Sequence, residues 1–418
     1  MRIIVLGGGV VGVATAYFLA RAGHQVTVVE RRTEVARETS FANAGLIAPG
    51  HSYTWNSPRA PLILLKSLWR DDMALRFHLS ADWRMWAWSL RFLANCTAAR
   101  SRKYTIIKLK LCLYSQQVLN QTAGETGVAY DAVNRGVLYL YRDPAHLARG
   151  VATMALLSDH GARLEAVDPE RCVEIEPALA GARDRVAGAI FAPGDASGDS
   201  RKFSEGLAAR CRDLGVVFEM GRTITAIRGD RSRIDGIDTD RGPLSADHYV
   251  LALGSYSPLL ARGRGLGLDL PVYPVKGYSV TLPTEGGPGV PYVGGVDEAN
   301  LVAYCRMGDR LRLTATADFA GYDTAHRPAD FTQMLGVARD LFPRGGAYDK
   351  PDYWACLRPM TPDGPPILGP CRVKNLTLNT GHGHMGWTMA CGSARIVADM
   401  IDGKTPAIDT AGLTLERY

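Results

Sequence analysis

The chain has 418 residues, of which 46% are hydrophobic and 22% charged, with a formal net charge of +6. This composition is typical of a globular protein of two or three domains and excludes a disordered, coiled-coil or collagen-like chain. The mild charge, without long basic runs, argues against nucleic acid as a partner. Eight scattered cysteines without a Cys-x-x-Cys pair predict reduced thiols, a cytoplasmic location and no metal site.

A glycine-rich turn near the N-terminus predicts a dinucleotide-binding site. A short apolar strand over 2–6 leads into this turn, and a predicted helix then runs to Gly23. The turn has the pattern G-x-G-x-x-G and reads Gly7, Gly8, Gly9, Val10, Val11 and Gly12. Glycines let the backbone approach a pyrophosphate, whose charge the helix N-terminus stabilises. The uncharged stretch 3–20 is therefore a strand and a helix rather than a membrane span.

A second predicted strand over 25–29 leads to Glu30, 18 residues beyond Gly12. A carboxylate at this place can accept a hydrogen bond from a ribose hydroxyl. Glu30 therefore favours an unphosphorylated ribose and argues against NADP. The motif itself leaves FAD and NAD open.

Tryptophan is concentrated in one part of the chain, beside the apolar run 62–65 and several arginines. The five residues are Trp55, Trp69, Trp83, Trp86 and Trp88. Such a mixture suits a membrane interface. Apolar residues nevertheless occupy all sides of the helix predicted over 82–93, which predicts that this helix is buried. Peripheral membrane contact stays open for 58–70.

Two later segments favour FAD over NAD. Short strands are predicted at 216–219, 223–228 and 234–239, followed by an apolar strand over 247–254. A glycine-rich run at 380–386 then leads into a helix predicted over 387–400. The N-terminus of that helix is a second anion site, which beneath a flavin would stabilise negative charge on the reduced ring.

The chain resembles the FAD-dependent amino-acid oxidoreductases of the D-amino acid oxidase and glycine oxidase type. Within that family it is most similar to the D-amino acid dehydrogenases of the small-subunit type. The matching stretches are 7–30, 38–45, 254–257, 274–279, 357–364 and 379–393. The last two are specific to the dehydrogenase subfamily, whereas many flavoproteins share the first.

The resemblance implies an α/β fold in which two domains are interleaved along the chain. A Rossmann-like FAD-binding domain would take residues 1–60, 195–265 and 350–418. An α+β substrate-binding domain, built on a mostly antiparallel sheet, would take 61–194 and 266–349.

The resemblance also implies FAD as the cofactor, held by residues from several parts of the chain. The implied FAD-binding residues are Gly7, Gly8, Gly9, Val10, Val11, Gly12, Glu30, Arg31, Arg32, Ser40, Asn43, Ala44, Gly45, Thr223, Gly254, Arg358, Gly381, His382, Gly383, His384, Met385, Gly386, Trp387 and Thr388. Within this set, His382 and His384 would tune the electrostatics around the flavin rather than bind a metal, since no carboxylate or thiol lies at ligand spacing.

The implied reaction is the oxidative deamination of a D-amino acid. A hydride passes from Cα to flavin N5, water hydrolyses the imino acid to a 2-oxo acid and ammonia, and a quinone-type acceptor takes the electrons. The flavin carries the chemistry, so the protein must orient Cα and bind the carboxylate, for which an arginine is well suited. Arg358 is the implied anchor and Tyr278 the second, with Arg306 and His51 as further catalytic candidates.

Several related functions stay open. They are a D-proline or D-hydroxyproline dehydrogenase, a glycine or sarcosine oxidase, and a flavin subunit without turnover in a hetero-oligomer. Arg358 and Tyr278 argue against the last, because such a subunit needs no carboxylate anchor. Cys356 stands where sarcosine-oxidase-like relatives bond covalently to flavin, but we interpret it as a small packing residue. A quinone acceptor would place the enzyme in the cytoplasm, at the cytoplasmic face of the inner membrane.

Overall fold

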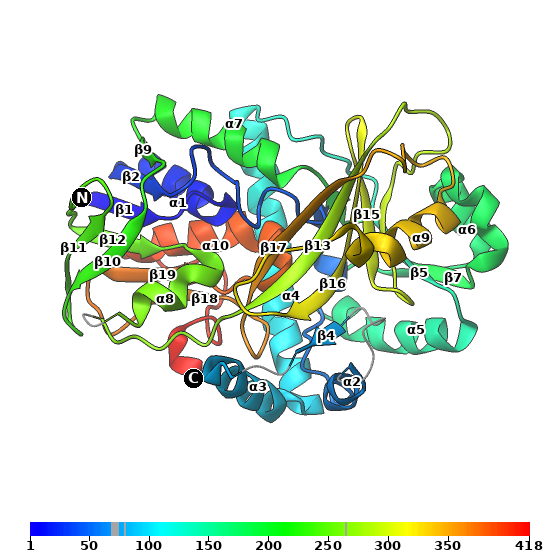
Figure 1. The fold of residues 1–418 in the computed structure, drawn as a ribbon, viewed down its shortest axis with the longest axis horizontal. Coiled ribbons are helices and arrows are strands. Elements are labelled where there is room, and N and C mark those ends of the chain that lie inside the picture. The colour runs from blue at the N-terminus through cyan, green and yellow to red at the C-terminus, as the bar shows by residue number, and fades with distance from the viewer. Residues whose placement is uncertain (68–74, 79–80, 264–265) are drawn as a thin grey trace.

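Two β-sheets of unlike topology lie side by side in the computed structural model (Figure 1), which describes residues 1–67, 75–78, 81–263 and 266–418. One sheet has six strands in the order β18-β19-β12-β1-β2-β9. The other has nine, in the order β17-β13-β16-β15-β14-β5-β7-β6, with β4 paired to β16. The predicted α/β fold with a mostly antiparallel second sheet is confirmed.

The six-stranded sheet has five parallel strands and one antiparallel edge strand, β18. Its strands are β1 (Arg2–Leu6), β2 (Gln25–Glu30), β9 (Val217–Met220), β12 (His248–Leu251), β18 (Ile367–Pro370) and β19 (Leu376–Thr380). Ile3 and Val5 of β1 pack into one hydrophobic cluster, and Ile4 and Leu6 into another on the opposite face. A parallel sheet buried on both faces needs such continuous apolar strands.

Helices cover one face of this sheet, and a β-hairpin with a short helix covers the other. The helices on the first face are α1 (Val10–Arg21), α7 (Ser200–Asp213) and α10 (Gly386–Ile401), with α4 (Ala98–Thr126) packed on α10. The second face is covered by the hairpin β10 (Ile224–Gly229) and β11 (Ile234–Thr239) and by α8 (Ser257–Ala261). Gly392 allows helices α4 and α10 to cross closely, since a Cβ at this position would lie only 2.6 Å from the Cβ of Ser115.

The nine-stranded sheet is antiparallel except where β5 pairs with β14 and β4 with β16. Its strands are β4 (Leu75–Phe77), β5 (Val137–Tyr141), β6 (Glu165–Val167), β7 (Gly188–Ala192), β13 (Tyr273–Pro283), β14 (Gly294–Asp297), β15 (Val302–Met307), β16 (Arg310–Phe319) and β17 (Asp352–Met360). Leu138 and Leu140 pack with α6 (Pro169–Ile175) and α9 (Thr332–Leu341), whereas Tyr139 packs with α5 (Pro144–Ser158). A two-stranded ladder of β3 (Leu46–Ile47) and β8 (Ala196–Ser197) is separate from both sheets.

Helix α3 (Trp83–Asn95) corrects one prediction, since it is not buried on all sides. Met85, Trp88 and Phe92 pack against β13 and β16, and the Trp88 indole donates to the Met360 carbonyl at 2.9 Å. Trp83 and Leu90 are 60% and 68% exposed. The helix lies at the periphery of the fold, so the sheet covers only one of its apolar stripes.

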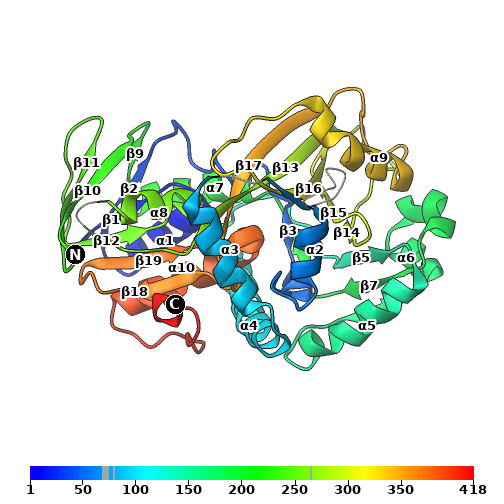
Figure 2. The same ribbon diagram turned by 60° about the horizontal axis from the view of Figure 1, so that its bottom comes forward.

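Helix α2 (Ala60–Ser67) also presents apolar side chains to solvent, those of Leu62, Ile63 and Leu65. Figure 2 shows α2 and α3 on the same side of the molecule. Trp69, within the segment 58–70 left open for membrane contact, lies outside the described residues. Among the helices that the structure describes, none is both long and apolar enough to span a bilayer.

Candidate functional site

A cavity of about 530 Å³ lies between the two sheets and is lined by both. The six-stranded sheet contributes the ends of β1 and β2, the loop after β12 and the N-terminal ends of α1 and α10. The nine-stranded sheet contributes residues of β13 to β17. The volume of the cavity is in the range of cofactor and substrate sites, and side chains from both sheets would contact a ligand bound there.

The predicted dinucleotide motif forms one end of this cavity. Gly7, Gly9, Val10 and Val11 line it directly. Gly12 does not, and it has a packing role instead, because a Cβ there would collide with the Gly7 carbonyl. The first turn of α1 therefore lies tight against the strand, with its N-terminus at the cavity.

Glu30 lines the same end and is held by backbone donors. Its Oε2 accepts from the amide of Gly8 and its Oε1 from the amide of Arg32, both at 2.8 Å. Gly8 and Arg32 do not themselves line the cavity, and the Arg32 guanidinium donates to Glu38 at 2.7 Å. The Glu30 carboxylate thus stands in a fixed position with lone pairs left for a ligand hydroxyl.

The loop after β2 forms a second wall through Ser40, Asn43 and Ala44. Ser40 accepts from the Val10 amide at 3.1 Å, and the Asn43 amide group donates to Ser200 at 2.8 Å. Gly45 lies behind this wall rather than in it. Its φ of +72° and its contact with Met307, which a Cβ would overlap, require glycine at that position.

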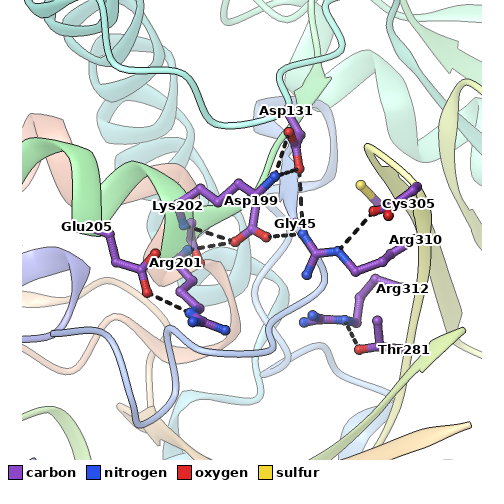
Figure 3. A network of polar contacts seen from close by, with 12 residues as sticks. Gly45, Asp131, Asp199, Arg201, Lys202, Glu205, Thr281, Cys305, Arg310 and Arg312 are labelled. Atoms are coloured by element: carbon purple, nitrogen blue, oxygen red, sulfur yellow. Dashed lines mark hydrogen bonds and ion pairs between the residues drawn. The ribbon is translucent and has the colours of Figure 1, made fainter. Parts of the chain in front are cut away.

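A charged network ties this loop and α7 to the nine-stranded sheet (Figure 3). Arg310 of β16 pairs with Asp199 at 2.9 Å and with Asp131 at 3.5 Å, and Asp131 also pairs with Lys202. Arg312 donates to the carbonyl of Asn43 at 3.2 Å. Burial lowers the pKa of this guanidinium to about 10, which leaves it charged at neutral pH. The network fixes the loop relative to both sheets.

The second glycine-rich run forms the opposite wall, through the start of α10. Residues 382–388 all line the cavity, whereas Gly381 turns the chain behind them with a φ of +76°. Two buried polar atoms of this wall, Asn379 Oδ1 and Trp387 Nε1, have no hydrogen-bond partner among the described residues. Buried polar atoms are normally satisfied, so these two, with the free N–H groups of α10, fit a bound polar group.

Both histidines of this wall are held neutral. Nε2 of His382 lies 2.9 Å from the Ser393 hydroxyl, and burial lowers the pKa of this imidazole to about 3. His384 stacks on Trp55 with ring centroids 5.0 Å apart. Burial, and then the charges of Lys108 and Arg358, lower the pKa of His384. The pair therefore offers the cavity dipoles and ring surface rather than positive charge.

Arg358 lines the cavity from β17 and is held by backbone carbonyls. Its Nη1 donates to Thr316 at 2.7 Å and its Nη2 to Ala315 at 3.3 Å. Thr316 has a φ of +59°, at a bulge where β13 and β16 shift register. The guanidinium crosses β13 at Gly277, where a Cβ would lie 2.6 Å from Cζ.

No described carboxylate lies within ion-pair distance of the Arg358 guanidinium. Burial lowers its pKa but does not neutralise it, because an arginine stays protonated at neutral pH. A desolvated charge without a counter-ion is costly. An anion that entered the cavity could therefore pair with this guanidinium.

The other predicted catalytic residues have different fates. Tyr278 lines the cavity, but its hydroxyl donates to Asp318 at 2.8 Å. Arg306 does not line the cavity, and its Nε donates to the Gly308 carbonyl at 3.0 Å. Side chains alternate along β15, so Ala303 faces the cavity and Arg306 the opposite side.

His51 lines the cavity, with its Nε2 2.8 Å from Glu298 and its ring stacked on Tyr139 at 4.8 Å. Burial lowers the pKa of His51 and the Glu298 carboxylate raises it, and the net shift is upward. His51 thus lines the cavity with an acidic partner, Glu298, as Tyr278 does with Asp318.

Several lining residues were not predicted, and all of them except Gly277 lie outside the matching stretches. These residues are Trp55, Tyr139, Arg222, Gly277, Val296, Thr314, Ala315, Thr316 and Ala317. Cys356, taken as a packing residue, also lines the cavity. Burial raises the pKa of this thiol to about 11. The pairing of β13 with β16 and β17 brings Gly277, residues 314–317 and Cys356 together, whereas the other residues come from other elements.

Comparison with known proteins gives matches over the whole chain. A family model described as FAD dependent oxidoreductase matches residues 2–400. D-amino acid dehydrogenase 2 of Mesorhizobium japonicum is 47% identical over 416 residues, covering 99% of each chain. D-amino acid dehydrogenase of Paramagnetospirillum magneticum is 46% identical over 419 residues, covering 100% of this chain and 99% of its own.

Solved structures match the fold at lower sequence identity. Glycine oxidase from Geobacillus kaustophilus has a TM-score of 0.75 at 24% identity, covering 100% of this chain and 99% of its own. L-proline dehydrogenase from P. horikoshii has a TM-score of 0.74 at 18% identity, covering 100% and 98%. These likenesses concern the arrangement of the two sheets.

Proposed function

The chain belongs to the FAD dependent oxidoreductase family, and we propose that it oxidises D-amino acids to 2-oxo acids and ammonia. The observation that carries the proposal is the Arg358 guanidinium, which faces the cavity without an acidic partner among the described residues. The D configuration is supported by the names of relatives at 46% and 47% identity. The substrate carboxylate would supply the missing counter-ion.

FAD fits the residues that line the cavity. The amides at the start of α1 and the Glu30 carboxylate suit the pyrophosphate and the ribose, and the start of α10 with Trp387 and Asn379 suits the ring. When bound, FAD supplies the N5 atom that accepts the hydride from Cα. The two proposed domains, 1–60 with 195–265 and 350–418, and 61–194 with 266–349, would enclose it.

The chain's own task is to bind and orient the amino acid. Arg358 has five N–H donors, of which two are bonded to Thr316 and Ala315, so a fork remains for a carboxylate. The bonded carbonyls fix the plane of the fork, and hence the direction in which Cα points. Tyr278 is engaged with Asp318, so it supports the wall behind Arg358.

Anaerobic mixing with amino acids tests the proposal. The flavin absorbance should bleach with D-alanine and D-proline and stay unchanged with the L-forms. Bleaching by D-proline alone would identify a cyclic imino acid dehydrogenase, and bleaching by glycine or sarcosine alone would identify an oxidase-type relative. An unchanged spectrum with every compound would contradict the proposed activity.

We further propose a quinone-type electron acceptor, with the enzyme in the cytoplasm at the inner membrane. The exposed apolar residues of α2 and α3, among them Leu62, Trp83 and Leu90, supply a surface for peripheral contact. The enzyme reduced by D-alanine should be reoxidised faster by a short-chain ubiquinone than by oxygen. Faster reaction with oxygen would contradict the acceptor, and failure to sediment with anionic vesicles would contradict the membrane contact.

A further inference from the structure

A second cavity, of about 270 Å³, lies directly behind the first. His51 and Tyr139 line both cavities, so these two side chains form the wall between them. The rings stack with centroids 4.8 Å apart and an interplanar angle of 18°. A ligand in the second cavity would therefore lie one ring pair away from the proposed catalytic cavity.

Two carboxylates hold this wall in place, and each already has a hydrogen-bond or ion-pair partner within the protein. The Tyr139 hydroxyl donates to Asp195 at 2.7 Å, and the same carboxylate accepts from the Gly50 amide at 3.0 Å. Glu298 pairs with His51 at 2.8 Å. Among the described residues that line the second cavity, Glu298 is the only carboxylate, and it is already paired with His51 within the wall.

Unpaired basic side chains form the rim of the second cavity. His146, Arg149 and Thr153 line it from α5, at spacings of three and four residues that place them on one helix face. Arg59 lines it from the segment before α2. Both arginines are exposed, and among the described residues neither guanidinium has a hydrogen-bond or ion-pair partner.

Nearby arginines show that this lack of pairing is local. Arg142, two residues before α5, pairs with Asp297 at 2.9 Å and Asp340 at 2.7 Å. Arg185 pairs with Asp340 at 2.9 Å. The lining of the second cavity thus carries net positive charge, from Arg59 and Arg149, with no described acid to neutralise it.

The remaining wall is aromatic, formed by Tyr53 and Tyr141 beside Leu164. Burial is the main cause that raises the pKa of both tyrosines, which stay neutral. Tyr141 reaches the face of α5 only because residue 150 is glycine, since a Cβ on Gly150 would collide with the Tyr141 hydroxyl. The cavity therefore combines a cationic rim with a wall suited to a short carbon chain.

We propose that the second cavity binds a small carboxylate through Arg59 and Arg149. The inference rests on the proposed function for the source of that carboxylate. A 2-oxo acid carries a net charge of about −1, whereas its parent amino acid is a zwitterion, so a positive rim attracts the product more strongly. The site would hold the 2-oxo acid on its way out of the catalytic cavity.

Arginine modification of the FAD-loaded enzyme tests this site. Phenylglyoxal should label Arg59 and Arg149, and 2-oxopropanoate should protect both against labelling, as read by peptide mass spectrometry. Arg231, exposed and without a partner among the described residues, is the internal control and should stay unprotected. L-Alanine, a zwitterion that the proposed reaction leaves unchanged, should protect only weakly in place of 2-oxopropanoate. Equal protection by both would show that the site does not prefer the 2-oxo acid, and protection by neither would overturn the proposal.

Substitutions separate this site from the catalytic cavity. Arg149→Gln should raise the concentration of 2-oxopropanoate that half-protects Arg59 by about two- to fivefold, in the range of exposed charge contacts, and Arg231→Gln should leave it unchanged. An unchanged value in Arg149→Gln would overturn the site. In wild type, 2-oxopropanoate bound at Arg358 should also shift the FAD absorbance, and Arg358→Gln should abolish this shift without altering protection of Arg59. Failure of that second arm alone would count against the proposed function and not against the second cavity.

Discussion

At Arg358 the fold holds a guanidinium between two carbonyls and opposes it with no described carboxylate. Arg417 is paired with Asp363 at 2.6 Å, and the buried Arg312, which has no ion pair among the described residues, does not line the cavity as Arg358 does. The contrast is informative because an unpaired desolvated charge is costly and persists where function requires it. The proposed activity depends more on this difference than on any other side chain.

The neighbouring thiol allows a prediction about how FAD is held. Burial raises the pKa of Cys356 to about 11, so the thiol is protonated and a poor nucleophile at neutral pH. Acid precipitation should therefore release all the flavin into the supernatant, from wild type and from Cys356→Ser alike. Yellow colour retained in the wild-type pellet, and lost in Cys356→Ser, would show a covalent bond.

Arg358 and Arg306 show what the sequence could tell at this scale. Both were candidate anchors, and Arg358 was favoured because it belongs to a motif. Which arginine faces the cavity depends on strand alternation and on register, which place Arg358 opposite Val275 and turn Arg306 away. The engagement of the Tyr278 hydroxyl by Asp318 was equally invisible, since 40 residues separate the two.

At the scale of elements, the crossing of β13 and β17 positions the proposed carboxylate anchor. Gly277→Ala would place a Cβ 2.6 Å from the Arg358 guanidinium and displace it. Loss of charged hydrogen bonds worth about 1.5–3 kcal/mol should raise KM for D-alanine about ten- to a hundredfold. Steady-state kinetics measures this.

The matched control is Gly124→Ala in α4, where no atom lies within 4 Å of the added methyl group. That variant should retain the wild-type KM, and both variants should retain FAD. A wild-type KM in Gly277→Ala would show that the guanidinium does not bind the substrate.

The turn from β19 into α10 predicts how stability depends on pH. His382 has a pKa of about 3 in the folded state against 6.5 for the free side chain, because burial disfavours its charged form. The unfolded chain therefore binds a proton more readily, and stability falls as the pH drops from 6.5 towards 3. At pH 5 the loss from this group is about 2 kcal/mol.

Urea unfolding of the FAD-loaded enzyme at pH 7 and pH 5 measures this loss. His382→Gln should lose less stability between the two values than wild type does. His326 is exposed, so His326→Gln is the control variant. Its free energy of unfolding should fall between pH 7 and pH 5 as much as that of wild type. If the free energy of unfolding of His382→Gln fell as much as that of wild type, His382 would not be the source of the pH dependence.

Elements that carry motifs could be predicted, and those without motifs could not. The strand, glycine turn and helix at 2–21 and the helix at 386–401 match their predictions because local spacing specifies them. The bulge at Thr316 carries no local signal, since its positive φ follows from the pairing of β13 and β16. Helix α3 was taken as buried because hydropathy does not show which apolar face the sheet will cover.

At the scale of the whole molecule, the chain passes repeatedly between two sheets that share one cavity. Strands β1, β2, β9, β12, β18 and β19 form one sheet, and the strands of the other lie between them along the chain, as do the separate pairs β3-β8 and β10-β11. The network around Arg310 joins the two parts (Figure 3). A ligand that contacts both sheets should therefore stabilise both together.

Removal of FAD tests this coupling. A ligand present at about a hundred times its Kd stabilises a protein by about 2.7 kcal/mol, so FAD should raise the Tm measured by calorimetry by several degrees. The heat-capacity peak should stay single with and without FAD. A second peak that does not respond to FAD would show that the two parts unfold independently.

The most direct measurement of the central claim compares the rates of anaerobic flavin bleaching by D-alanine and by D-alaninamide, which lacks the carboxylate. Wild type should bleach far faster with D-alanine, whereas Arg358→Gln should be slow with both, because removing either partner removes the same interaction. The loss of rate caused by removing the carboxylate and the loss caused by replacing Arg358 should therefore not add. If Arg358→Gln still preferred D-alanine as strongly as wild type does, the carboxylate would bind elsewhere and the account of the site would be wrong.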